Sequence, residues 1–445
     1  MKIQETYPLT VCLALLFFFS CTSDRKSVDY SNGNMVASWE QNLTETIMVD
    51  MFPPPTASRI YAYSNIAAYE ALRFTDSTKL SFAGRLNGLG ELPLPEKNLD
   101  YDYRVSALTA FSTVAAEFTY TKDHIRSFEK TQSDSLLKTG IDPTTYTRSV
   151  EFGKLLAASI LKWAGADNFK KTRGMVRYTL QHNPSSWEPT PPDYLQGAEP
   201  HWDKIRPFTI DSASQFRPDS IPVAFSTSPS SEFYQNAVKI VTSTRSIDSN
   251  QLSMTAFWDD NPGVSSVYGH MKQIKKKMTP GGHWMAITGN VVQAKKMDMS
   301  SSAELFAVTA IAISDAFITC WDAKYHFQTI RPITYIHRHI TTDWLPILQT
   351  PAFPEFPSGH ATISAAAATV LTAYAGDNFS FTDSTEFQFG LPVRSFTSFM
   401  EAAKESAASR FYGGIHFMPS NIAGTKLGIE TGTTVLNKIR SKPVL

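Results

Sequence analysis

The chain has 445 residues, of which 42% are hydrophobic and 18% are charged, so it is long enough and apolar enough to bury a large core. Its 41 Lys and Arg residues balance its 41 Asp and Glu residues. This composition excludes a disordered chain and a basic nucleic-acid-binding protein. An anion-binding site would have to gather positive charge locally, because the neutral molecule has no long-range attraction for anions.

The N-terminal segment predicts export. Residues 9–20 form an almost wholly apolar run after Lys2, which is typical of a signal peptide and short for a membrane span. The run ends at Cys21 and resembles a bacterial lipoprotein box, with Cys21 as the acylated residue. We predict a signal peptide over 1–20 and a linker over 21–35, in a protein held by lipid at a bacterial membrane and facing the periplasm or the cell surface. The alternatives are an ordinary cleaved signal and an uncleaved anchor.

Helical periodicity dominates the rest of the chain. Apolar residues recur at three- and four-residue spacing over 36–75, 104–119, 123–138, 145–165, 233–243, 251–257, 302–321, 359–375, 396–411 and 421–440. Strand-like alternation is scarce. The pattern predicts an all-α helical bundle with long proline-rich loops.

A proline-rich stretch divides the helical pattern. Nine of the 26 prolines fall between residues 184 and 229, which predicts a long irregular connection over 184–230. We therefore predict an N-terminal helical part over 36–183 and a C-terminal helical part over 231–445. The connection could separate two domains or lie over one domain, and we favour the second arrangement.

Two cations, Lys324 and Arg331, stand seven residues apart in the C-terminal part. On a helix this spacing is nearly two turns, so both side chains would project from one face. Taken alone, such a pair is typical of a solvated stripe.

The segment Pro357-Ser358-Gly359-His360 precedes an alanine-rich run that predicts a helix. Ser358 stands where an N-cap belongs, and Gly359 allows a ligand to approach the backbone. The free N–H groups of a helix start bind anions, and His360 would stand beside them. A plain capped helix start is the alternative interpretation.

A third segment places Arg410 at a helix end, with Gly413 and Gly414 breaking the helix and His416 after the turn. A single histidine after a turn is usually structural. A functional site is favoured because three cations, an anion-binding helix start and two histidines occur together and in this order.

The three blocks, K-x6-R-P, P-S-G-H and S-R-x5-H, resemble the signature of the vanadium-dependent haloperoxidases and the type 2 phosphatidic acid phosphatases. The predicted exported form and the Trp-Asp-Ala before Lys324 resemble the haloperoxidase branch. The resemblance implies an oxidoreductase with a vanadate cofactor. Such an enzyme oxidises halide with hydrogen peroxide and halogenates a small organic acceptor.

The resemblance also implies residue roles. Five residues would bind the vanadate or phosphate oxyanion, namely Lys324, Arg331, Ser358, Gly359 and Arg410. His416 would ligate vanadium, and His360 would act as the acid/base, a task that suits its near-neutral pKa. Lys324 would also polarise the activated peroxide, which makes it catalytic together with both histidines.

Four further residues are expected around the halide or behind the ligands. Phe353 falls where fungal chloroperoxidases carry Phe and algal bromoperoxidases carry His, and Trp321 and Phe353 could otherwise be core aromatics. Asp260 is expected to pair with a site arginine. The family pattern usually has an Asp four residues after the last histidine, whereas Ser420 stands there and brings no negative charge to His416.

Two other functions use the same residues. The first is an acid phosphatase that acts on a phosphate ester through a phosphohistidine. The second is a catalytically weak surface lipoprotein that binds an oxyanion, for which Ser420 is the main support. An intramembrane lipid phosphatase is disfavoured because no run of eighteen apolar residues follows residue 20, so we expect membrane contact through the lipid anchor only.

Overall fold

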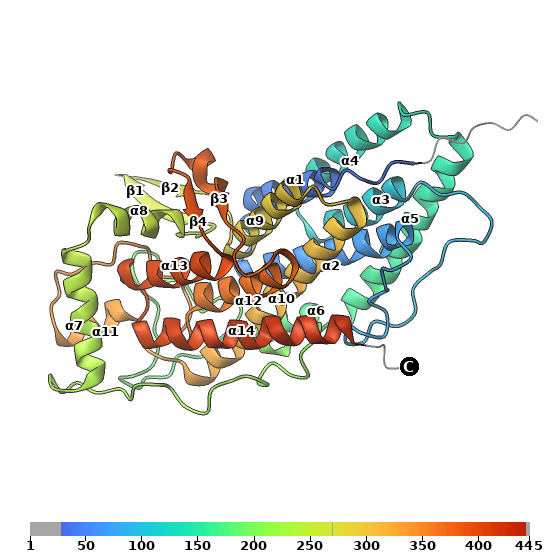
Figure 1. The fold of residues 1–445 in the computed structure, drawn as a ribbon. Coiled ribbons are helices and arrows are strands. Elements are labelled where there is room, and N and C mark those ends of the chain that lie inside the picture. The colour runs from blue at the N-terminus through green and yellow to red at the C-terminus, as the bar shows by residue number, and fades with distance from the viewer. Residues whose placement is uncertain (1–27, 269, 442–445) are drawn as a thin grey trace, which may run out of the picture.

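A computed structural model describes residues 28–268 and 270–441 of the chain (Figure 1). The predicted signal peptide and Cys21 lie outside the described residues. Helices make up 58% of the structure, and loops and two small sheets make up the rest of the described residues. The predicted all-α fold class is confirmed.

The N-terminal helices are α1 (Asn34–Asp50), α2 (Pro54–Leu72), α3 (Tyr103–Phe118), α4 (Lys122–Leu137), α5 (Pro143–Gly165) and the short α6 (Phe169–Thr172). The sequence predicted one helix over 36–75, which is wrong. Met51 adopts a left-handed backbone with φ 54°, and the three prolines that begin at Pro53 lack the N–H groups needed to continue a helix. The chain therefore breaks after α1 and restarts with Pro54 in the first turn of α2.

The C-terminal helices are α7 (Glu232–Arg245), α8 (Ser249–Phe257), α9 (Pro280–Lys295), α10 (Met299–Phe327), α11 (Pro332–His339), α12 (Gly359–Ala375), α13 (Phe399–Tyr412) and α14 (Met418–Arg440). Two antiparallel hairpins pair β1 (Val264–Tyr268) with β2 (Met271–Lys275), and β3 (Phe381–Asp383) with β4 (Arg394–Phe396). The sequence did not predict α9, although Thr279 caps it and Pro280 begins it.

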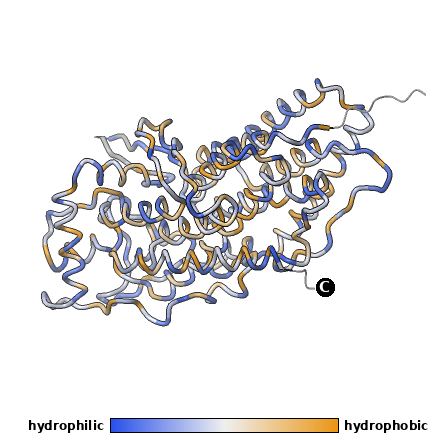
Figure 2. The backbone as a smooth tube through the Cα atoms, in the orientation of Figure 1, coloured by the Kyte–Doolittle hydropathy of each residue, from blue (hydrophilic) through white to orange (hydrophobic). Residues whose placement is uncertain are grey.

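Helix α10 runs through the centre of the bundle and packs against α2, α12 and α14 (Figure 1). By length and composition it could cross a membrane, but 94% of its apolar window is buried inside the protein, as in the core helix of a soluble bundle. Hydrophobic residues gather on the inner helices and hydrophilic residues on the outer loops (Figure 2).

Close packing between α12 and α14 fixes the start of α12. A Cβ atom at Gly424 of α14 would lie 2.6 Å from the Ser358 carbonyl oxygen, and one at Gly428 would lie 2.1 Å from the Thr362 carbonyl oxygen. Only glycine permits so close an approach of two backbones. The segment that carries Ser358 is therefore held in place by α14.

The proline-rich connection lies against the bundle. Trp187 and Trp202 are fully buried, and the backbone N–H groups of Phe208 and Thr209 donate to the Asp315 carboxylate of α10 at 2.7 and 2.8 Å. These hydrogen bonds satisfy a buried charge in the core helix. They also anchor a segment that has almost no regular structure of its own.

Candidate active site

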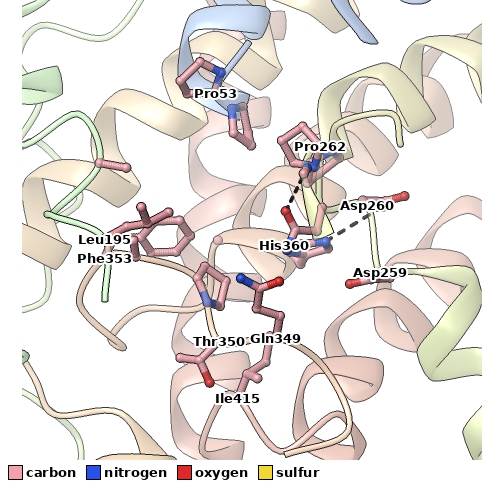
Figure 3. A pocket seen from close by; sticks show the side chains of 18 of the residues that line it. Pro53, Leu195, Asp259, Asp260, Pro262, Gln349, Thr350, Phe353, His360 and Ile415 are labelled. Carbon is pink, nitrogen blue, oxygen red and sulfur yellow. Dashed lines mark hydrogen bonds and ion pairs between the residues drawn. The ribbon is translucent and has the colours of Figure 1, made fainter. Parts of the chain in front are cut away.

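One cavity of about 300 Å³ is lined by residues of α9, α10, α12 and α13, the start of α2, and loops between helices (Figure 3). Gly359 and His360 of α12, Arg410 of α13, and His416 before α14 form part of its wall. Most of the remaining wall is apolar, including Met51, Pro53, Leu195, Pro262, Phe317, Trp321 and Phe353. The structure thus brings together seven of the predicted site residues around a mainly apolar chamber, because Asp260, Trp321 and Phe353 also line it.

Ser358 occupies the N-cap position of α12, where the sequence placed it. Its hydroxyl, however, makes no capping hydrogen bond, and within the described residues this buried oxygen has no hydrogen-bond partner. A buried hydroxyl without a partner costs free energy unless a ligand satisfies it. Gly359 follows in the first turn, whose N–H groups lack acceptors inside the helix.

Arg331 does not lie on the same helix as Lys324. Helix α10 ends at Phe327, Gln328 adopts a left-handed backbone with φ 52°, and Arg331 is the N-cap residue of α11. The predicted common helical face is wrong because Arg331 precedes Pro332, and a residue before proline disfavours helical backbone angles.

The Arg331 guanidinium is buried and only partly bonded. Nε donates to the Phe353 carbonyl oxygen at 2.9 Å, and Nη1 donates to the Ile415 carbonyl oxygen at 2.8 Å. Nη2 has no hydrogen-bond partner among the described residues. Burial lowers the pKa of Arg331 to about 10, so the group keeps its charge at neutral pH. Arg331 therefore offers a charged donor that is not yet used.

Lys324 is fully buried behind the cavity wall and does not line the cavity. Its Nζ donates to the carbonyl oxygens of Pro354, Glu355 and Pro357 at 2.9, 3.0 and 2.6 Å. These bonds use all three ammonium donors. Burial lowers the pKa of Lys324 to about 7, and the nearby Arg331 acts in the same direction. In this structure Lys324 holds the loop over 354–357.

Phe353 lies between the two cations. The Lys324 Nζ is 5.0 Å and the Arg331 Cζ is 5.1 Å from its ring centroid, which are cation–π distances. The Trp321 ring lies 4.9 Å from the same ring, and both aromatics line the cavity. The structure thus places Trp321 and Phe353 at the cavity as well as in the core.

Arg410 joins the loop after α8 to His360. Its Nη2 donates to the Trp258 carbonyl oxygen, and its Nη1 lies 3.4 Å from the Asp259 carbonyl oxygen and 3.3 Å from His360 Nε2. Burial lowers the pKa of His360 well below its usual value, and the Arg410 charge adds to this effect. His360 is therefore a neutral imidazole at pH 7.

The predicted pairing of Asp260 with a site arginine is wrong. Arg410 donates to backbone oxygens beside Asp260, whereas Asp260 Oδ1 bonds to His283 Nδ1 at 2.8 Å. Its other oxygen, Oδ2, lies 3.8 Å from His360 Nε2. Asp260 therefore faces two histidines, and no spacing pattern in the sequence indicated His283.

His416 has a carboxylate partner after all, because Glu355 supplies the charge that Ser420 lacks. His416 Nδ1 lies 2.9 Å from Glu355 Oε1, which also accepts the Phe417 N–H at 3.0 Å. The Ser420 hydroxyl donates to Glu355 Oε2 at 2.7 Å. The predicted lack of negative charge at His416 is thus wrong, and Ser420 acts on His416 through Glu355.

The Glu355 carboxylate sets the state of the His416 ring. A carboxylate only accepts hydrogen bonds, so it holds the proton on Nδ1 and leaves a lone pair on Nε2. Nε2 accepts from Arg331 Nη1 at 3.2 Å. Burial lowers the pKa of His416 well below its usual value, with Arg331 adding to the effect, so the ring is a neutral ligand. Burial also raises the pKa of Glu355, against the hydrogen bond from Ser420 and the charge of Arg331.

Comparisons with known proteins identify the fold. The family model described as the VCPO second helical-bundle domain matches residues 304–443. A bacterial vanadium-dependent iodoperoxidase superposes with a TM-score of 0.85 at 39% identity, over 93% of this chain and 97% of the iodoperoxidase. A bacterial vanadium-dependent chloroperoxidase in its holo form superposes with a TM-score of 0.66 at 16% identity, over 93% of this chain and 99% of the chloroperoxidase. No curated protein matches the sequence.

The helical bundle is that of the vanadium haloperoxidase superfamily, as the sequence resemblance implied. At 39% identity over nearly its whole length, the chain belongs to the family of vanadium-dependent haloperoxidases. It is therefore an enzyme of the oxidoreductase class. The chloroperoxidase match at 16% identity supports the fold alone.

Proposed function

We propose that this haloperoxidase oxidises iodide with hydrogen peroxide and delivers the oxidised iodine to a small organic acceptor. The observation that carries the proposal is a set of buried polar atoms in and beside one cavity. Ser358 Oγ and Arg331 Nη2 have no hydrogen-bond partner among the described residues, and His416, whose Nε2 lone pair accepts only from Arg331 Nη1 at 3.2 Å, lines the cavity. The choice of iodide is supported by the 39% identity to an iodoperoxidase. Iodide is also the most easily oxidised of the common halides.

Vanadate fits this set of donors. Arg331 Nη2, Ser358 Oγ and the first N–H groups of α12 would donate to its oxygens, and His416 Nε2 would ligate its central atom. Arg410, buried beside His360, would add a second guanidinium to the anion pocket. When bound, vanadate would supply a Lewis acid that activates hydrogen peroxide, and the oxidation state of vanadium would not change.

His360 supplies the acid/base chemistry. Because its imidazole is neutral, Nε2 takes a proton from hydrogen peroxide and later returns it to a leaving oxygen. The Arg410 charge beside Nε2 disfavours the protonated ring, which returns the proton readily. The apolar wall around Trp321 and Phe353 limits water in the chamber and leaves room for a polarisable halide or a small organic acceptor.

Lys324 contributes through the loop it holds. Its three hydrogen bonds fix the segment that carries both the Glu355 carboxylate and the start of α12. We therefore assign it a positive charge near the bound anion and a role in placing Glu355 behind His416. Direct contact between Lys324 and activated peroxide would require its Nζ to leave at least one of these carbonyl oxygens.

We also propose that the protein is exported and lipid-anchored through Cys21, on the basis of the apolar run over 9–20. Metabolic labelling with a palmitate analogue in a bacterial host should mark the wild-type chain and not Cys21→Ala. Equal labelling of both chains would refute the anchor.

An assay of the purified protein with hydrogen peroxide and iodide, bromide or chloride tests the function. We expect iodide oxidation that appears when orthovanadate is added to vanadate-free protein. Activity with bromide at a comparable kcat/KM would refute the halide assignment. Hydrolysis of a phosphate ester that vanadate inhibits, with no halide oxidation at any vanadate concentration, would favour the phosphatase alternative.

A further inference from the structure

A buried cluster of carboxylates surrounds a second histidine next to His360. Its members come from four elements: Asp260 after α8, His283 in the first turn of α9, Asp383 at the end of β3, and Glu386 in the 3-10 helix Thr385–Phe389. All four side chains are buried. The proposed reaction assigns no role to His283, Asp383 or Glu386.

His283 is held as a cation between two carboxylates. Its Nδ1 lies 2.8 Å from Asp260 Oδ1, and its Nε2 lies 2.9 Å from Asp383 Oδ2. Carboxylates only accept, so both ring nitrogens donate and the ring is an imidazolium. Although burial opposes protonation, Asp260 and Asp383 together hold the pKa of His283 well above its usual range. The ring also stacks on Trp258 at 4.5 Å with an interplanar angle of 16°, which favours a cation.

Asp260 turns its remaining acceptor toward the active site. His283 holds Oδ1, while Oδ2 accepts no hydrogen bond within the described residues and lies 3.8 Å from His360 Nε2 (Figure 3). The Asp260 backbone has φ 40°, a left-handed conformation that few residues other than glycine adopt. Strain of this kind persists only where the surroundings fix the residue, and it is frequent at functional sites.

Glu386 completes the cluster as a neutral group. Neither of its carboxyl oxygens has a hydrogen-bond partner among the described residues, and burial together with Asp260 raises its pKa to about 8. Single ligand atoms of Asp260, His283 and Glu386 lie within 4.8 Å of one another, a spacing compatible with a metal ion. Both His283 nitrogens already donate to carboxylates, however, so no lone pair is left for a metal. The carboxylates would also repel an oxyanion such as vanadate.

We propose that His283 and Asp383 are positioning residues, which lock Asp260 so that its Oδ2 receives the hydrogen bond of protonated His360. In the resting enzyme, Arg410 Nη1 donates to His360 Nε2 at 3.3 Å. When His360 takes a proton on Nε2, that nitrogen becomes a donor and needs an acceptor, and Asp260 Oδ2 is the nearby free oxygen. Asp260 Oδ2, held in place by His283 and Asp383, thus stabilises the short-lived imidazolium of His360, while the His283 charge itself acts in the opposite direction.

The other charged groups near this chain are already paired or oriented. Lys277 Nζ bonds to Asp259 Oδ2 at 2.9 Å, and Arg410 is held by the backbone oxygens of Trp258 and Asp259. Lys277 and Arg410 are donors, the Asp259 carboxylate is paired with Lys277, and the Trp258 carbonyl oxygen near His360 is shared with Arg410. Asp260 Oδ2 is thus the carboxylate oxygen beside His360 that has no hydrogen-bond partner among the described residues. The inference rests on the proposed acid/base role of His360.

The kinetic test compares Asp383→Asn and His283→Gln with the wild type as vanadate-loaded holoenzymes. We expect each substitution to lower kcat for iodide oxidation by about tenfold to hundredfold, because the acid/base group is weakened. The KM for iodide and the vanadate affinity, measured by calorimetry, should stay within about threefold of the wild-type values. Unchanged kcat in both variants would overturn the inference while leaving the proposed function intact. Loss of vanadate binding in the wild type would instead refute the proposed function.

A matched control separates positioning from general loss of stability. Asp167 is also buried and pairs with Arg59 at 2.6 Å, away from the cavity. Asp167→Asn should therefore lower the melting temperature and leave kcat within about twofold. A fall in kcat that simply follows the melting temperature across the three variants would overturn the inference.

A spectroscopic test does not depend on activity. In vanadate-free protein labelled with ¹⁵N-histidine, we expect one buried imidazolium with two N–H protons at pH 8 that disappears in His283→Gln. A neutral His283 ring would overturn the inference. None of Zn²⁺, Mn²⁺ and Ca²⁺ should bind stoichiometrically at the cluster. An ion that binds there and is released by Glu386→Gln would show that the cluster is a metal site, which would overturn the inference.

Discussion

The Glu355 carboxylate offers the sharpest test of how His416 becomes a ligand. Glu355→Gln keeps the size of the side chain and can keep its hydrogen bonds. The amide oxygen can accept from His416 Nδ1 and the Phe417 N–H, while the amide N–H₂ can face Ser420 Oγ, which then accepts. The substitution therefore removes the charge and little else.

The expected loss follows from the hydrogen bond at 2.9 Å between His416 Nδ1 and Glu355 Oε1. A bond to a charged acceptor contributes about 1 kcal/mol more than one to a neutral acceptor, and partners behind metal-binding histidines typically change affinity by about tenfold to hundredfold. We expect Glu355→Gln to weaken vanadate binding in that range, which equals about 1.4–2.7 kcal/mol. Calorimetric titration of vanadate-free protein with orthovanadate measures this loss.

The control for this test is Ser420→Ala, which removes one hydrogen bond to Glu355 and keeps the charge. It should weaken vanadate binding only severalfold. Wild-type affinity in Glu355→Gln, with a melting temperature close to that of the wild type, would refute the role of the carboxylate. Equal losses in both variants would show that geometry and not charge is what matters.

Three other substitutions give independent tests. Adding Ser420→Asp to Glu355→Gln should recover part of the lost vanadate affinity, because the new carboxylate stands where related sequences carry Asp. A double variant that binds vanadate no better than Glu355→Gln would show that a carboxylate at position 420 cannot replace that of Glu355. Ser358→Ala should weaken vanadate binding about tenfold. It should not lower the melting temperature of the vanadate-free protein, because the hydroxyl makes no capping hydrogen bond. A lower melting temperature would show that the hydroxyl is hydrogen-bonded in the vanadate-free protein. Burial raises the pKa of Glu40 to about 8, above an unfolded value of 4.5, so its contribution to stability is full below pH 4.5 and is lost as the pH rises to 8. Urea unfolding should show Glu40→Gln gaining stability relative to the wild type by about 1.4 kcal/mol per pH unit between pH 5 and 7.5. Parallel pH profiles of the two proteins would refute the raised pKa of Glu40.

The sequence predicted those parts of the fold that depend on local pattern. Long apolar periodicity located α10 and α14, and the Pro-Ser-Gly-His segment located the start of α12. Two local signals outside the apolar pattern mark further helix boundaries. Thr279 and Pro280 mark the start of α9, and Pro332 marks the break before α11.

The missed site residues depend on contacts between distant segments. Glu355 lies 61 residues before His416, and no periodicity links the two. His283 meets Asp383 across 100 residues, through a hairpin of only three residues in each strand. Local propensity carries no information on such pairs, because the packing of α9, α12 and the β3–β4 hairpin brings them together. The sequence therefore predicted Arg410, His360 and His416 at the cavity and named Asp260 with the wrong partner, but it missed Glu355 and Asp383.

A crystal structure of the full-length protein soaked with orthovanadate, with vanadium located by anomalous scattering, tests the vanadate site most directly. We expect one vanadium peak in the cavity, bonded to His416 Nε2 and within reach of Arg331 and Ser358. A peak at the carboxylate cluster around His283, or no peak at saturating orthovanadate, would contradict this expectation.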